Sequence, residues 1–204
     1  YKGLSSVPRM SVSACNSLRS LYNTQYDSFN DLLKDMVEVK LNVAQLENLI
    51  KLDYFEEFGD INYLLGYLKA YKKYQHRKKR YELIAEDMKD VPKGLTSVYE
   101  IIQYSYDVCG MVSVVYSSIA DNYYFVTEIK GTKYSLYQIA TGKTVQYRIR
   151  GKLSKQSPIK VTDIIRVNEI GQEGKWRKGA DDKWFQSDTD IEDIIKSYII
   201  VKKS

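Results

Sequence analysis

The spacing of apolar residues changes near residue 92, and this change constrains the fold more than any other feature of the sequence. Before it, apolar residues recur every three or four positions, which is typical of amphipathic helices. After about residue 111 they alternate with polar residues, which favours strands. We therefore predict an α+β chain with a helical domain at residues 1–92, a linker with a connecting helix at 93–110, and a small, mainly antiparallel β-barrel at 111–204.

Capping residues and hydrophobic spacing define the helices of the first part. Ser11 and Asn42 each precede an apolar stripe and suit an N-cap, as does Ser28 or Asn30 before a short helix. The expected helices cover residues 11–21, 29–36, 43–52 and 61–88, and a further helix is expected near 97–106. The sequence VPKG at residues 91–94 is the clearest linker, because proline and glycine break regular structure.

Short alternating segments fill the second part and are separated by turn residues such as Asp-Asn and Thr-Gly pairs. The expected strands cover residues 111–119, 123–130, 134–139, 144–150 and 164–170. Five short strands at near-regular spacing indicate a closed or half-closed barrel. Residues 191–201 leave two alternatives, since Asp190 can cap a helix there, whereas Tyr198 and the apolar residues after it favour a strand.

The composition excludes several classes of protein. Apolar residues make up 44% of the 204 residues and charged residues 28%, the balance of a globular rather than a disordered chain. No apolar run is long enough to cross a membrane, so we expect no membrane partner and a cytoplasmic location. Cys15 and Cys109 lack the spacing of metal ligands and are expected to be reduced thiols. The sequence starts at Tyr1 without a leader, so we expect a fragment of a longer protein.

The sequence contains no recognisable catalytic or metal-binding group. His76 is the single histidine, and no second histidine or cysteine pair stands near it to complete a zinc site. No glycine-rich phosphate-binding loop is present either. Acidic residues gather near the end of the chain, at Asp181, Asp182, Asp188, Asp190, Glu192 and Asp193. A solvated loop and a helix N-terminus explain them better than a divalent metal site, so we expect no cofactor in this chain.

A dense run of positive charge lies within residues 69–80. Seven of these twelve residues are lysine or arginine, and none is acidic. Five of them recur at spacings of three or four and would share one face of a helix, namely Lys69, Lys72, Lys73, Arg77 and Arg80. A phosphate backbone is the usual partner of such a stripe, but a solvated surface helix explains it equally well. The net charge of +5 permits nucleic-acid binding without requiring it.

A second basic group is expected on a strand. Arg148, Arg150 and Lys152 would project from one face of that strand, with Tyr147 on the other face. Such a face is compatible with a barrel surface that binds single-stranded nucleic acid. An ordinary strand with a polar outer face is the alternative.

Residues 49–59, LIKLDYFEEFG, resemble a segment of the alpha subunit of bacterial DNA polymerase III. In that family a helix ends in the pattern LIK–x–Gly–x–Phe–Asp–x–Leu–Gly. The positions that match it identically or conservatively are Leu49, Ile50, Lys51, Phe55, Glu56, Phe58 and Gly59. Upstream, residues 3–21 (GLSSVPRMSVSACNSLRSL) are similar to the first hairpin of the family, and residues 26–36 (YDSFNDLLKDM) to the short helix after it.

The resemblance implies a tandem helix–hairpin–helix module followed by an OB-type barrel. It implies a role in DNA replication, with sequence-independent contact to primed duplex and template strand, and a first turn that offers backbone N–H groups to phosphates. The residues of that turn expected to contact DNA are Ser6, Val7, Arg9 and Met10. Ser6 and Pro8 stand where the family usually has glycine, and Asp53 replaces the glycine of the second hairpin.

The carboxylates that hold catalytic magnesium in this family are absent from the sequence. The chain is therefore expected to be a non-catalytic part of a polymerase that uses magnesium elsewhere. The alternative is a protein-interaction module that docks the sliding clamp, the clamp loader or another replisome subunit. An independent enzyme is the least supported of the three interpretations.

Overall fold

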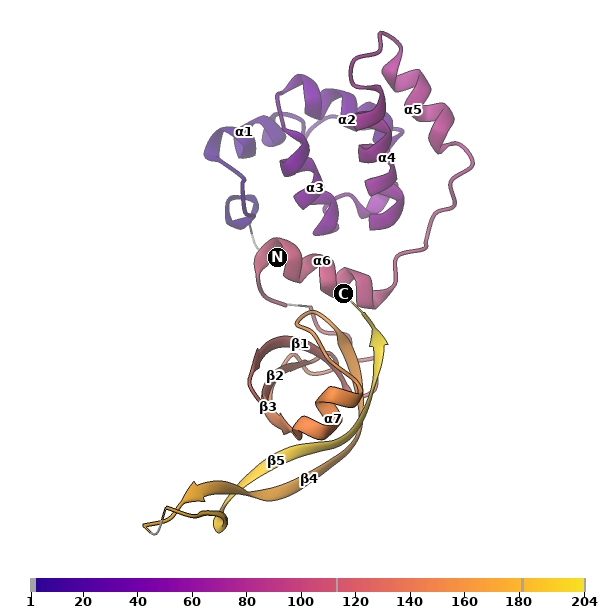
Figure 1. The fold of residues 1–204 in the computed structure, drawn as a ribbon. Helices are drawn as coiled ribbons and strands as arrows, with labels where there is room; N and C mark the ends of the chain where they lie inside the picture. Colours follow the sequence, from indigo (N-terminus) through magenta and orange to yellow (C-terminus); the bar gives the residue numbers. More distant parts are fainter. Residues whose placement is uncertain (1–2, 113, 181, 204) are drawn as a thin grey trace. The chain divides into compact units, whose positions relative to one another are not determined.

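The computed structural model describes residues 3–112, 114–180 and 182–203. It divides into two compact units, Tyr1–Gly110 and Met111–Ser204, each with its own hydrophobic core. The first unit is helical, and the second is built from strands and one short helix (Figure 1). The α+β class that the change of hydrophobic period predicts is confirmed.

Three helices of the helical unit begin at the expected capping residues. Its elements are η1 (Leu4–Ser6), α1 (Val12–Ser20), α2 (Phe29–Glu38), α3 (Val43–Lys51), η2 (Glu56–Phe58), α4 (Ile61–Tyr74), α5 (Arg80–Met88) and α6 (Val98–Cys109), where η marks a short 3-10 helix. The side chains of Ser11, Ser28 and Asn42 each accept a hydrogen bond from the backbone N–H three residues on. The N-cap predictions for α1, α2 and α3 are confirmed.

Aromatic rings meet at the centre of the helical unit. The ring of Phe29, at the start of α2, is centred 5.7 Å from Phe55, 6.0 Å from Phe58 and 5.4 Å from Tyr67. Phe29 is only 2% exposed. Fully buried side chains on three helices surround these rings, namely Leu33, Met36, Leu49, Ile50 and Leu64. The apolar stripes of α2, α3 and α4 therefore face one shared core.

The single helix expected over residues 61–88 is wrong, because a turn at residues 75–79 divides it into α4 and α5. Beyond the turn, α5 folds back on α4 and buries Ile84 and Met88. Gly66 permits this approach, since a Cβ at that position would lie 3.0 Å from the terminal methyl of Met88. The free energy gained by burying the apolar face of α5 against α4 exceeds the helix propensity of the basic residues, which alone would favour one continuous helix.

The expected connecting helix is α6, and it packs within the helical unit rather than serving only as a linker. Ser97 caps it in the predicted region. The hydroxyl of Tyr104 donates to Oδ1 of Asn62 on α4 at 2.7 Å. The chain leading to α6 is held as well, because the backbone N–H of Gly94 donates to the carboxylate of Asp60 at 2.6 Å. These contacts fix α6 against the start of α4.

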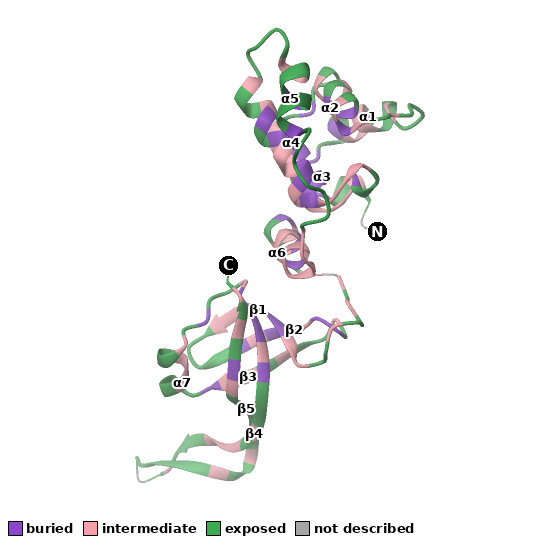
Figure 2. Ribbon diagram, turned by 90° about the vertical axis from the view of Figure 1, so that its right-hand side faces the viewer, coloured by how far each residue is buried: buried purple, intermediate pink, exposed green. Residues whose placement is uncertain are grey.

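The strand unit forms a closed five-stranded barrel. Its elements are β1 (Tyr123–Lys130), β2 (Lys133–Gln138), β3 (Thr144–Ile149), α7 (Gly151–Gln156), β4 (Ile164–Lys178) and β5 (Trp184–Lys202). The strands follow the order β1-β2-β3-β5-β4, and β4 pairs back with β1. Strands β3 and β5 run parallel, whereas the other neighbours are antiparallel. Val126, Leu136, Ile149, Ile165 and Ile195 fill the interior (Figure 2).

The strand expected at residues 111–119 is wrong for the residues that the structure describes, and residue 113 of that segment lies outside them. The pairing of β4 with β1 already closes the sheet, so no edge is left for another strand. Two hydrogen bonds to the region of β2 hold the segment instead. The N–H of Tyr116 donates to the carbonyl of Ile139 at 3.0 Å, and the hydroxyl of Tyr137 donates to the carbonyl of Val114 at 2.8 Å.

Residues 191–201, for which the sequence allows either a helix or a strand, belong to β5. Ile194, Ile195 and Tyr198 are buried against the barrel core, and Asp190 lies within the strand and caps no helix. Strand β4 also continues well past the expected end at residue 170. Together β4 and β5 extend beyond the barrel as a two-stranded ribbon, which is mostly exposed (Figures 1 and 2).

Candidate nucleic-acid interface

The first turn, residues 3–10, already uses several of its backbone donors. The N–H groups of Ser6, Val7 and Met10 donate to the carbonyls of Gly3, Leu4 and Val7 respectively, at 2.8, 3.2 and 3.1 Å. The side chains of Val7 and Met10 are buried, 4% and 8% exposed. Val7 and Met10 therefore hold the turn on the core, so of the four residues expected to contact DNA only Ser6 and Arg9 have exposed side chains. The hydroxyl of Ser6 donates to the carbonyl of Gly3 at 2.7 Å.

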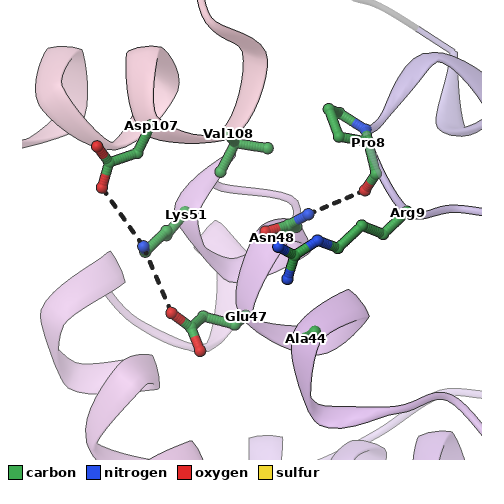
Figure 3. A pocket seen from close by; sticks show the side chains of 8 residues that line it. All are labelled: Pro8, Arg9, Ala44, Glu47, Asn48, Lys51, Asp107 and Val108. Carbon is green, nitrogen blue, oxygen red and sulfur yellow. Dashed lines mark hydrogen bonds and ion pairs between the residues drawn. The ribbon is translucent and has the colours of Figure 1, made fainter.

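Helix α3 holds the first turn in place. Nδ2 of Asn48 donates to the carbonyl of Pro8 at 2.9 Å, and Nε2 of Gln45 donates to the carbonyl of Arg9 at 3.1 Å. Arg9 adopts the left-handed conformation, with φ of +69°. Its side chain extends toward Asn48 over a cavity of about 360 Å³ (Figure 3). A guanidinium at a fixed turn is well placed to contact a phosphate.

The floor of this cavity is a network of balanced charges (Figure 3). Nζ of Lys51 lies 3.4 Å from Glu47 and 3.5 Å from Asp107, and Nζ of Lys72 lies 3.4 Å from the other oxygen of Glu47. Burial opposes the charge of Glu47, but the two lysines together outweigh burial and lower the pKa of this carboxyl. The network keeps Glu47 ionised beside Arg9.

The basic run does not form one continuous stripe, because the turn at residues 75–79 interrupts it. Four of its members have partners within the helical unit. Lys72 pairs with Glu47, Lys73 lies 2.8 Å from Asp87, and Lys79 lies 3.4 Å from Glu82. Arg80 donates to the carbonyl of Gln75 while its guanidinium lies over the ring of Tyr81. In the described part of the chain, no ion pair is found for the exposed Lys69, Arg77 and Lys78.

The second turn, residues 52–59, is acidic and has few donors to offer. Asp53 has φ of +60°, and its N–H and that of Tyr54 donate to carbonyls of the last turn of α3. Burial raises the pKa of the Asp53 carboxyl, and the nearby charges of Glu56 and Asp60 raise it further. Asp60 caps α4 by accepting from the N–H groups of Asn62 and Tyr63. A carboxylate thus occupies the helix N-terminus that a phosphate would need.

The expected basic face of the barrel is largely neutralised. Nη2 of Arg148 lies 3.0 Å from Glu173, and Glu192 pairs with the same guanidinium, whose side chain is only 15% exposed. Arg150 also pairs with Glu173. Lys152 is exposed but lies in α7, so its expected place on a strand is wrong. Arg148 therefore joins β3 to β4 and β5 rather than standing free toward a ligand.

One group of exposed residues was not predicted from the sequence. Trp176, Trp184 and Phe185 lie at the far end of the β4–β5 ribbon and are 53%, 63% and 51% exposed. In the sequence they stand among charged and polar residues, with Trp176 alone and Trp184 next to Phe185. The only signal that the two tryptophans could lie close together is the short stretch of seven residues, with Gly179, between them.

Comparison of the chain with protein-family models, with curated proteins and with solved structures found no match. Within the described residues, no group of three or more His, Cys, Asp or Glu side chains is arranged to hold a metal ion. Over the same residues, no helix has the length and apolar character needed to cross a membrane. Cys15 and Cys109 are free thiols.

Proposed function

We propose that the chain is a non-catalytic, DNA-binding part of a DNA polymerase III alpha-type protein, with an OB-like second unit. The observation that carries the proposal is the strand order β1-β2-β3-β5-β4 with α7 between β3 and β4. Closed five-stranded barrels of this kind commonly bind oligonucleotides. The resemblance of residues 1–70 to the helix–hairpin–helix region of the family supports the same assignment.

The helical unit would bind primed duplex without reading its sequence. Lys69, Arg77 and Lys78 offer charges that are not held in ion pairs within the described residues, and Arg9 adds a guanidinium at the first turn. Lys72 and Lys73 can join them, because exposed ion pairs are worth only about 0–1 kcal/mol and a phosphate competes with them. The second turn serves as scaffold, since Asp60 already caps α4. Catalytic magnesium would belong to another part of the parent polymerase.

Binding of a fluorescent primed-template DNA, measured by anisotropy at low salt, tests this proposal. The triple variant K69E/R77E/K78E should bind at least tenfold more weakly than the wild type, for any DNA sequence. The matched control K34E/K40E/K89E makes the same change in net charge with exposed lysines from other positions of the helical unit. Equal affinity of the two triple variants would contradict the assignment of the basic residues.

A second candidate function is docking of another replisome subunit. A groove of about 800 Å³ in the helical unit favours it, because its lining includes Leu4, Leu18, Leu21, Tyr22 and Phe55. An apolar groove of this kind is typical of a peptide-binding surface. Nuclease-treated pull-down with purified clamp and clamp-loader proteins separates the two functions. Capture that survives nuclease treatment, together with undetectable DNA binding, would favour docking.

A further inference from the structure

The tip of the β4–β5 ribbon concentrates aromatic and basic side chains. It holds both tryptophans of the chain, together with Phe185, and all three side chains are more than half exposed. Residues 175–185 also include four cations against two carboxylates. Large exposed aromatic side chains gathered at one point of a surface mark an interaction site rather than part of a core.

The register of the ribbon places the two tryptophans on one face. Lys178 pairs with Trp184, and Trp176 pairs with Gln186. Cross-strand partners share a face, and so do residues two apart on a strand. Trp176 and Trp184 are therefore diagonal neighbours, whose Cα atoms are typically about 7–8 Å apart, within reach of aromatic side chains. The register thus places both indole rings on the same face of the ribbon tip, where each can stack on an unpaired base.

The opposite face of the tip carries cations beside an aromatic ring. Arg177 pairs with Phe185 across the strands. Asp190 forms ion pairs with both Arg177 and Lys175, and Nζ of Lys175 lies 2.7 Å from the carboxylate. Hydrogen bonds from these two cations lower the pKa of Asp190. The cations sit at exposed positions, where an ion pair is weak and a phosphate can take the place of the aspartate.

We propose that the ribbon tip is a stacking site for unpaired bases of single-stranded DNA. The inference rests on the proposed function, which supplies DNA as the ligand class, but it concerns a different surface from the basic residues of the helical unit. Aromatic faces that stack on bases, next to cations that contact phosphates, are the recurring elements of single-strand binding. A protein partner fits less well, because lysine is depleted at protein interfaces and three of the four cations are lysines.

Intrinsic tryptophan fluorescence reports on this site alone, because the chain has no other tryptophan. Titration with a dT20 oligonucleotide at low salt should quench the emission, whereas a blunt duplex of the same length should quench it less. In anisotropy with labelled dT20, W176A and W184A should each weaken binding about fivefold to 150-fold, the range expected for one lost stacking contact. The control Y22A removes an aromatic side chain of the helical unit that is more exposed than either tryptophan, and it should bind dT20 like the wild type.

The variant D190N tests whether the cations of the ribbon tip contact the phosphates of the DNA. It removes the carboxylate that holds Lys175 and Arg177, so dT20 should bind about threefold to tenfold more tightly. The helical triple variant K69E/R77E/K78E should lose affinity for primed duplex yet keep the dT20 quench, which separates failure of one site from failure of the other.

Two results would overturn the assignment of the tip. The first is unchanged emission with dT20 together with wild-type affinity of W176A and W184A. The second is quenching by a purified clamp or clamp-loader protein but not by dT20, which would make the tip a protein-docking site. Neither result bears on duplex binding by the helical unit.

Discussion

Replacement of Asp53 by glycine should stabilise the helical unit. Asp53 ends α3 with φ of +60°, in the left-handed region that glycine adopts without strain. For other residues this conformation costs about 1–2 kcal/mol, and the greater chain entropy of glycine offsets about 0.5–1 kcal/mol of that gain. The two ranges leave a net gain of about 0–1.5 kcal/mol, so we expect D53G to raise the free energy of unfolding by about 0.75 kcal/mol, the midpoint, and Tm by about 3–6 °C.

The charge of Asp53 makes part of the free energy of unfolding depend on pH. Burial, Glu56 and Asp60 raise the pKa of this carboxyl, so the folded state binds its proton more tightly than the unfolded state does. The ionised form therefore destabilises the fold, and stability is lost as the pH rises through the folded-state pKa. The variant D53N tolerates the same backbone but carries no charge. It should be more stable than the wild type at pH 7 and equal to it at pH 3, below the ordinary pKa of Asp.

Lys40 provides a matched control, since it ends α2 in the same way with φ of +66° and is exposed. K40G should gain a similar amount from the backbone alone, independent of pH. Urea unfolding followed by circular dichroism at 222 nm, at pH 3 and pH 7, measures all three variants. The reasoning is refuted if D53G is no more stable than the wild type at pH 7, or if D53N gains as much at pH 3 as at pH 7.

Three further outcomes follow from the same contacts. F29A should cost about 3–5 kcal/mol in urea unfolding because its ring fills the centre of the helical core, whereas the exposed F185A should change stability by less than about 0.5 kcal/mol. R148A should lower the stability of the strand unit by about 1–3 kcal/mol, since it removes the partner of the part-buried Glu192 and leaves the part-buried Glu173 with Arg150 alone, and R150A by less than about 0.5 kcal/mol; tyrosine fluorescence during thermal unfolding separates them. D53N should change the affinity for primed-template DNA, measured by anisotropy, by less than about twofold. A tenfold gain would instead place the second turn on the DNA.

Local features of the sequence predicted the helix starts well. Ser11, Ser28 and Asn42 cap their helices through bonds to residues three positions away, so the information lies within one turn. The break at residues 75–79 depends on distant contacts instead. Its residues are compatible with a helix, and the chain turns there because Met88 packs against Gly66.

The strand unit shows the same contrast. Asp193 and Glu192 have low strand propensity, yet they lie in β5 because each pairs across the ribbon with a residue of β4. The charges of Arg148 and Arg150 were visible in the sequence, but their common partner Glu173 lies more than twenty residues away. The placement of the two tryptophans on one face likewise depends on a strand register that no local pattern specifies.

The salt dependence of binding to primed-template DNA is the decisive measurement for the proposed DNA contacts of the helical unit. Arg9, Lys69, Arg77 and Lys78 would neutralise about four phosphates, and Lys72 and Lys73 up to about two more, so log Kobs against log salt concentration should have a slope of about −3.5 to −5.5. In K69E/R77E/K78E the slope should be less negative by about 3, while K34E/K40E/K89E should keep the wild-type slope. A slope near zero for the wild type, or the same slope in both triple variants, would contradict DNA binding by these residues.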